Sequence, residues 1–156
     1  MKERGLYLDK AQPAAFTALK AFQATVSDAW RAAGLDPILV ELVRIRISQL
    51  NGCAYCLDSH SRAALELGED PRRLSMLPAW RECDWFTPEE TTALALAETI
   101  AIPTEANQRW EVEAEARAVF GDQAFSALCM VAISIDANNR LSIISRHRVP
   151  GRPRPE

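Results

Sequence analysis

The sequence lacks an excess of positive charge and any long apolar run. Its 18 Lys and Arg stand against 21 Asp and Glu, a formal net charge of -3. Such a chain has no global basic field that would attract a nucleic acid or an anionic bilayer. No run of eighteen apolar residues is present, and the N-terminal segment has no apolar core of a signal peptide. We therefore expect a cytoplasmic protein that binds neither nucleic acid nor membrane.

The sequence also lacks the compositional bias of unusual chain classes. With 48% hydrophobic and 25% charged residues, and only 6 Gly and 9 Pro in 156 residues, it is neither collagen-like nor low-complexity nor disordered. A chain of this length forms one domain and buries roughly 70% of its extended surface. We expect a single helical domain over residues 1–145, followed by a basic, proline-rich tail over 146–156.

Alternating strand patterns are missing as well, because apolar residues recur almost everywhere at spacings of three and four. The sequence thus predicts an all-α helical bundle. Capping residues, prolines and glycines mark where the helices of this bundle begin and end. Helices are expected over 13–33, 37–50, 53–67, 87–102, 105–120 and from 123 into the 140s, with a short helix after residue 70. Residues 77–86 are expected to form an irregular segment rich in aromatic side chains.

Four cysteines are too few for a secreted disulfide scaffold. Cys53 and Cys56 stand three residues apart at the expected start of a helix, a spacing typical of redox or metal sites. His60 follows four residues later, so these three side chains share one helix face. Free backbone N–H groups and the helix dipole lower the pKa of a thiol in the first turn. We expect Cys56 to ionise readily there.

A carboxylate is expected to join this group. If Asn51-Gly52 forms the tight turn of a helical hairpin, Glu41 lies within about one helical turn of His60. Glu41 interrupts an apolar face, where burial would raise its pKa toward the range of proton transfer. His60 would then accept a proton from Cys56, and Glu41 would orient the imidazole.

Other interpretations stay open from the residues alone. Glu41 would also form an ordinary buried ion pair with Arg44 or Arg46. A non-catalytic module, stabilised by zinc or sensing redox state, is the main alternative, although no second CxxC supports a zinc site. Its four tetrahedral ligands would be Cys53, Cys56, His60 and Cys83.

The spacing of a Glu, eleven residues, a CxxC pair and a His four residues later resembles the alkylhydroperoxidase D and carboxymuconolactone decarboxylase family. The residues that match are Glu41, Cys53, Cys56 and His60. Gly68 and the Asn-rich stretch 136–140 extend the resemblance. It implies an all-helical, AhpD-like homo-oligomer that reduces hydroperoxides without a bound cofactor or metal.

The resemblance also implies roles for the residues. Cys56 would attack the peroxide and become a sulfenic acid, and Cys53 would resolve it to a disulfide. His60 and Glu41 would relay the proton. A dihydrolipoyl group or similar dithiol, carried by a partner protein, would reduce the disulfide. Tyr55 stands where the best-known peroxidases have a second histidine, and its phenol would bind the peroxide by a hydrogen bond without acting as a base.

Overall fold

The computed structural model describes residues 6–102 and 106–151, and these contain helices and no strand. The all-α prediction is therefore confirmed. The elements are α1 (Leu8–Ala11), α2 (Pro13–Ala32), α3 (Pro37–Asn51), α4 (Ala54–Glu66), α5 (Pro71–Met76), the 3-10 helix η1 (Leu77–Glu82), α6 (Pro88–Ala101) and α7 (Ala106–Ser145).

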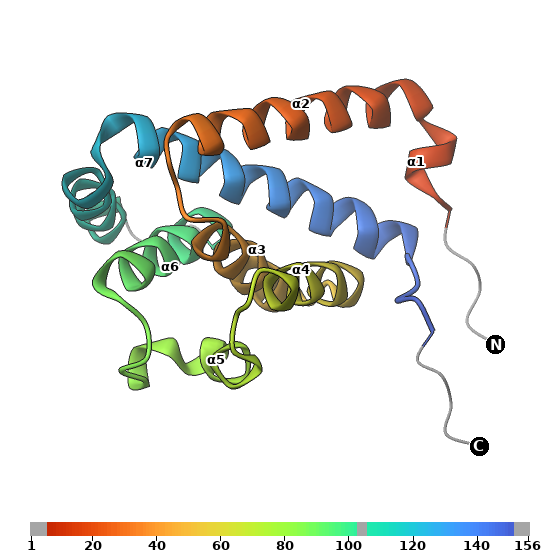
Figure 1. The fold of residues 1–156 in the computed structure, drawn as a ribbon. Coiled ribbons are helices and arrows are strands. Elements are labelled where there is room, and N and C mark those ends of the chain that lie inside the picture. Colours follow the sequence, from red (N-terminus) through yellow and green to blue (C-terminus); the bar gives the residue numbers. More distant parts are fainter. Residues whose placement is uncertain (1–5, 103–105, 152–156) are drawn as a thin grey trace, which may run out of the picture.

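Helix α7 is the centre of the bundle and packs against α2, α3 and α6. Figure 1 shows α2 lying along the second half of α7, with α3 and α4 beneath them in this view. The larger core cluster joins α3 to α7 through fully buried side chains, among them Val40, Ile47, Leu128 and Val131. The opposite face of α3 packs into a second cluster with Leu42 and Leu77. Helix α3 is thus buried on two faces, and a polar side chain on it needs a partner.

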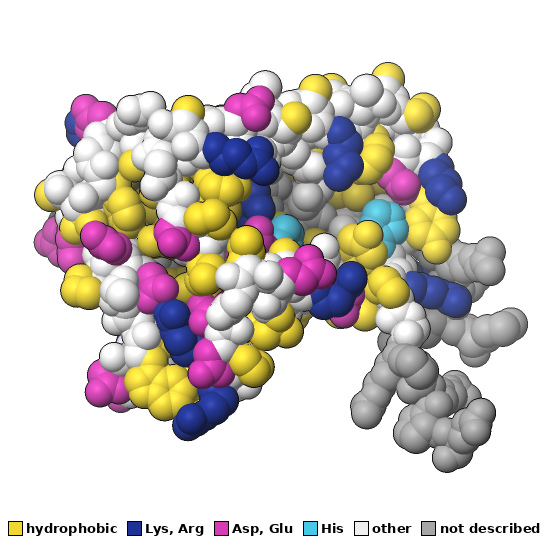
Figure 2. All heavy atoms as spheres, in the orientation of Figure 1, with side chains coloured by type: hydrophobic (Ala, Val, Ile, Leu, Met, Phe, Trp, Pro, Cys, Tyr) yellow, Lys and Arg dark blue, Asp and Glu magenta, His cyan; other side chains and the backbone are white. Residues whose placement is uncertain are grey.

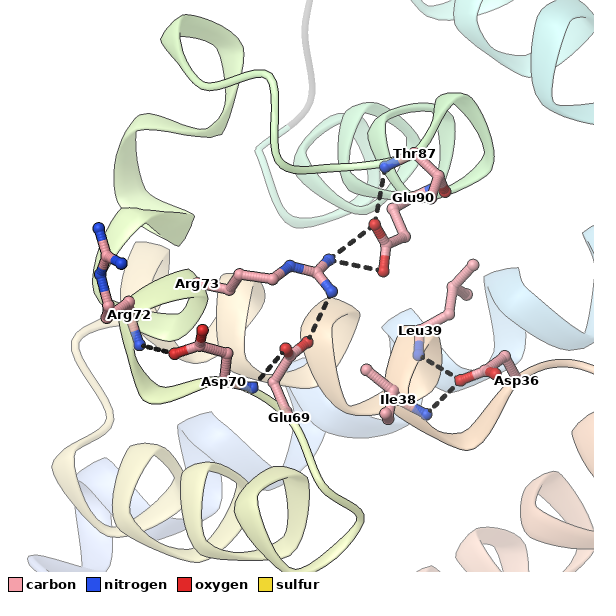
Figure 3. Close-up of polar contacts among 9 residues, drawn as sticks. All are labelled: Asp36, Ile38, Leu39, Glu69, Asp70, Arg72, Arg73, Thr87 and Glu90. Atoms are coloured by element: carbon pink, nitrogen blue, oxygen red, sulfur yellow. Dashed lines mark hydrogen bonds and ion pairs between the residues drawn. The ribbon is translucent and has the colours of Figure 1, made fainter.

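The predicted capping residues begin the helices as expected. Asp36 caps α3 and Asp70 caps α5, each accepting a backbone N–H at 2.7 Å. Thr87 and Glu90 form a reciprocal capping box at the start of α6. Figure 3 shows these contacts together with Arg73, which donates to both carboxylate oxygens of Glu90 at 2.7 Å. The arginine therefore ties α5 to the first turn of α6.

One region differs in part from the sequence prediction. Residues 77–82 of the segment expected to be irregular form the short 3-10 helix η1, which is itself broken at Ala79, where φ is -118°, between the buried Leu77 and Trp80. The expected end of one helix at Gly121 and the start of the next are confirmed, because α7 consists of two helical parts that meet at a break at Gly121, where φ is 71°. The expected stop at Pro103 and start at Glu105 lie outside the described residues.

Helix α7 is central, as its apolar sequence predicts, yet its outer face carries exposed apolar side chains. Met130 is 39% and Ile133 47% exposed, whereas neighbouring Leu128 and Val131 are buried. By length and composition alone, residues 108–145 would be able to cross a membrane, and a third of the most apolar window is buried within the chain. The core helix of a soluble protein meets the same criteria, so length and composition alone are weak evidence for a membrane-spanning helix.

Candidate functional site

The hairpin of α3 and α4 turns at Gly52, as the Asn51-Gly52 pair predicts. Gly52 has φ 69°, in the left-handed region that glycine adopts without steric cost. Its N–H donates to the carbonyl of Gln49 at 3.2 Å, and the next N–H, of Cys53, donates to Ser48 at 3.0 Å. These are the two hydrogen bonds of a Schellman motif. The motif reverses the chain so that Cys53 becomes the N-cap of α4.

The Gly52→Ala variant is expected to lose about 1 kcal/mol of unfolding free energy, because an L-residue with a Cβ is strained at positive φ. An added Cβ would contact nothing within 4 Å, so steric clash does not enter. Urea denaturation measures the loss. Gly52→Asn should recover part of it, since asparagine tolerates this conformation, and Gly151→Ala is the unstrained control. Equal stability of Gly52→Ala and wild type would contradict the account.

Polar contacts hold the end of α3 against α7. Asn51 Nδ2 donates to Asp136 Oδ1 at 2.8 Å. Ser48 Oγ lies 3.0 Å from Oδ1 of Asn139, which is fully buried. The stretch 136–140 therefore fixes the helix end that leads into the cysteine pair.

Glu41 on α3 faces His60 on α4 across the hairpin. Glu41 Oε2 lies 2.7 Å from His60 Nδ1, and Oε1 accepts from Arg44 Nη1 at 2.6 Å. The structure thus contains both the imidazole contact and the Arg44 ion pair that the sequence left as alternatives. Because an ionised carboxylate only accepts, Nδ1 carries the hydrogen and Nε2 of the neutral ring is the basic nitrogen.

The expectation of a raised pKa at Glu41 is wrong. Burial does push this pKa upward, since Glu41 is only 7% exposed. The hydrogen bond and charge of His60 and those of Arg44 outweigh burial and lower the pKa below its ordinary value of 4.5. Glu41 is therefore an ionised orienting group at neutral pH and not a proton donor.

The two cysteines meet in the first turn of α4. Cys53 Sγ accepts the backbone N–H of Cys56 at 3.3 Å. Cys53 is 1% and Cys56 4% exposed, and neither forms a disulfide. Both thiols are therefore free and shielded from bulk water.

The expectation that Cys56 ionises readily is also wrong for this state. Burial, with the neighbouring thiol of Cys53, raises the pKa of Cys56 to about 12, and a hydrogen bond from Ser142 only partly opposes this. Cys53 uses its sulfur to accept a backbone N–H of the first turn. The helix start therefore does not compensate for the loss of water, and Cys56 needs a base that removes its proton.

Cys56 and His60 share a cavity of about 710 Å³ between α2, α4 and the second half of α7. Figure 2 shows the surface hollowed here, with the two histidines of the chain in cyan. Tyr55, which is 40% exposed, also lines the cavity. Cys53 is not among the lining residues. A small molecule in this cavity therefore contacts Cys56 and not Cys53.

Sequence reasoning missed the part of the wall that comes from the end of α7 and the N-terminal segment. Ser142 and His147 line the cavity together with Tyr7 and Asp9 of the N-terminal segment. The sequence predicts that His147 belongs to the basic tail 146–156. A signal was available, since the chain has only two histidines, but nothing in the spacing joins residue 147 to Cys56.

The zinc alternative lacks its ligands in the structure. Over residues 6–102 and 106–151, no group of three or more His, Cys, Asp and Glu side chains is arranged to hold a metal ion. Cys83, the expected fourth ligand, packs instead against the core cluster of Leu42, Leu77 and Phe86. The geometry supports thiol and imidazole chemistry at Cys56 and His60 better than metal binding.

Two solved structures resemble this fold. One is a protein of unknown function from Agrobacterium tumefaciens, ATU0492, whose descriptive name relates it to the antioxidant defence protein AhpD. It matches with a TM-score of 0.86 and 25% identity over 96% of this chain and 100% of that chain. The other, an uncharacterized peroxidase-related protein from Silicibacter sp. TM1040, has a TM-score of 0.64 at 21% identity, over 83% of this chain and 68% of that one. The second likeness shows the fold alone.

Sequence comparisons agree with the fold. The uncharacterized protein YdfG of Bacillus subtilis (strain 168) is 37% identical over 108 residues, 69% of this chain and 74% of that protein. The uncharacterized protein YnjA of Escherichia coli (strain K12) is 34% identical over 68 residues, 44% of this chain and 37% of that protein. The model of the carboxymuconolactone decarboxylase family (CMD) matches residues 13–99. Because this match spans more than half of the chain and includes the cysteine pair, the protein belongs to the carboxymuconolactone decarboxylase family.

Proposed function

We propose that this protein is a thiol-dependent peroxidase of the AhpD type. The observation that carries the proposal is the cavity lined by both Cys56 and His60, with the thiol of Cys53 accepting the backbone N–H of Cys56. The name of the Agrobacterium relative and its close structural match support an antioxidant role.

In the proposed reaction His60 accepts the proton of Cys56 through Nε2, directly or through a water. The thiolate attacks the nearer oxygen of the hydroperoxide, the O–O bond breaks, and the alkoxide or hydroxide takes the proton back from His60. Cys56 is then a sulfenic acid. The thiol of Cys53 attacks this sulfur, a disulfide forms, and water leaves.

The accessibility of the two sulfurs decides their roles. Cys56 lines the cavity, whereas Cys53 is 1% exposed and lies behind it. Peroxide therefore reaches Cys56 first, and Cys53 is placed to attack the oxidised sulfur. An external dithiol, of the dihydrolipoyl type, is the proposed reductant that returns the pair to thiols. Tyr55 is proposed to donate a hydrogen bond to the bound peroxide.

Oxidation of the protein by one equivalent of hydroperoxide tests this function. We expect the tryptic peptide 47–62, which contains both cysteines, to lose two hydrogens as the Cys53–Cys56 disulfide forms. Mass spectrometry of the peptide before and after peroxide measures this. Dihydrolipoamide should restore the reduced mass.

The cysteines outside the site are the internal control of the same experiment. Peptides that contain Cys83 or Cys129 should stay reduced, because both thiols stand apart from the pair. For Cys129, burial raises the pKa to about 11. If peptide 47–62 stays reduced after one equivalent of hydroperoxide, the peroxidase proposal is overturned.

A further inference from the structure

We propose that Ser142, His147 and Asp9 form a second proton path to Cys56, on the side of the cavity away from the Glu41–His60 pair. The inference deepens the proposed function, because it rests on Cys56 as the nucleophile. Ser142 would contact the reacting sulfur, and His147 and Asp9 would act through it as positioning residues.

The contacts form a chain from the wall of the Cys56 cavity to a carboxylate. The hydroxyl-bearing side chain of Ser142, on the last turns of α7, lines the same cavity as Cys56. His147 Nδ1 lies 3.3 Å from Ser142 Oγ, and Nε2 lies 3.4 Å from Asp9 Oδ1. These separations are at the long end of hydrogen bonding, and such contacts shorten when the imidazole gains charge.

The backbone at the end of α7 explains why His147 reaches Ser142. Arg146 has φ 53°, and its N–H donates to Ile143 at 3.1 Å. The N–H of His147 donates to the carbonyl of Ser142 at 3.0 Å. This is again a Schellman motif, which folds the second residue past the helix back onto its last turn. The left-handed conformation costs free energy at a residue with a Cβ, so packing on this end must stabilise it.

Helix α1 brings the carboxylate to this end. The N–H of Leu8 donates to Ser145 Oγ of α7 at 3.1 Å, which places Asp9 beside His147. The side chains of His147 and Asp9 are 19% and 22% exposed. The His147–Asp9 pair is therefore largely shielded from water. A charged imidazole in such surroundings needs a carboxylate partner.

The His147 ring has aromatic, acidic and cationic side chains around it. The ring stacks on Tyr7 at 5.6 Å between centroids and meets the edge of Tyr55 at 5.5 Å. Asp9 is the acidic group in contact, and Ser142 leads to the thiol. The cationic side chains that line the same cavity are Lys20, Arg44 and Arg148, and Lys10 lies over the Tyr7 ring.

The chain moves one proton without any other reactant. Asp9 accepts from Nε2 of His147, so Nδ1 is the basic nitrogen of the neutral ring. Cys56 gives its proton to Ser142 Oγ as Ser142 gives its own proton to Nδ1. The products are an imidazolium beside Asp9 and a thiolate that accepts a hydrogen bond from Ser142. The reverse transfer protonates the leaving oxygen of the peroxide through the same hydroxyl.

Alkylation of Cys56 tests this path without peroxide, so its outcome is independent of whether peroxide is the substrate. We expect Ser142→Ala and His147→Gln to slow the reaction of Cys56 with iodoacetamide about tenfold at pH 7, the factor that one hydrogen bond to a charged group supplies. The rate is followed on peptide 47–62, with fragmentation separating Cys56 from Cys53. Asp9→Asn should give a smaller loss.

The pH profile separates a proton path from a structural role. His147→Gln should change the shape of the alkylation profile, because it removes the proposed proton acceptor, whereas a purely structural role would lower the rate equally at every pH. Ser142→Thr keeps the hydroxyl and should recover the rate, whereas Ser126→Ala, an exposed serine on the same helix, should change nothing. Wild-type alkylation rates in both Ser142→Ala and His147→Gln, or an unchanged profile in His147→Gln, would overturn the proposal.

Discussion

Replacing Cys56 by serine is expected to reduce peroxidase turnover by at least about 10³-fold, because loss of a nucleophile removes the reacting atom itself. A hydroxyl is nearly isosteric with the thiol but is not oxidised by peroxide. Turnover is measured as consumption of hydroperoxide with dihydrolipoamide as reductant. Thermal unfolding should show a folded variant, since the backbone N–H of Cys56 still donates to Cys53 Sγ and only the side-chain sulfur of residue 56 changes.

Cys53→Ser should behave differently from Cys56→Ser. The first oxidation of Cys56 remains possible, but no neighbouring thiol can resolve the sulfenic acid, so this species accumulates. A dimedone adduct on Cys56 reports it. Cys129→Ser, far from the pair in sequence, should retain turnover. Equal turnover of wild type and Cys56→Ser would remove Cys56 from the reaction.

The local sequence was sufficient to predict the hairpin and the contact between Glu41 and His60. Asn51-Gly52 fixes a Schellman turn between α3 and α4, and the two helices then bring Glu41 to 2.7 Å from His60. These contacts span 19 residues, and helix periodicity alone defines them. The capping box of Thr87 and Glu90 is similarly local, and it is present as expected.

The electrostatics of the site were not predictable in this way. The pKa of Glu41 depends on whether two cationic partners outweigh its burial, and that of Cys56 on whether a helix start outweighs its burial. Both are differences between opposing effects, which need the surrounding side chains. The contact of Ser142 with His147 depends on a left-handed arginine at 146. Glycine is the usual signal for such a turn, and it is absent there.

Glu41→Gln is expected to lower kcat/KM with hydroperoxide by roughly 10²-fold, the range of a general acid-base contribution. The neutral amide no longer requires the hydrogen of His60 to sit on Nδ1, so the basic nitrogen is no longer confined to the Nε2 position. The charge that stabilises a protonated imidazole during proton transfer is lost as well. Glu66→Gln, an exposed glutamate on α4, is the matched control for the loss of one negative charge.

The same variant makes a separate prediction for stability against pH. The pKa of Glu41 is lower in the folded chain than its ordinary 4.5, so the carboxylate stabilises the fold above pH 4.5. That contribution is lost as the pH falls from 4.5 through the folded value, because the group must then bind a proton. Glu41→Gln should lose about 2 kcal/mol at pH 7, since Arg44 and His60 keep only a neutral partner. The gap to wild type, followed by urea denaturation, should narrow below pH 4.5. A gap that stays constant down to pH 3 would mean that Glu41 contributes by its shape and not by its charge, and the imidazole would then lack the electrostatic partner on which the proposed proton transfer depends.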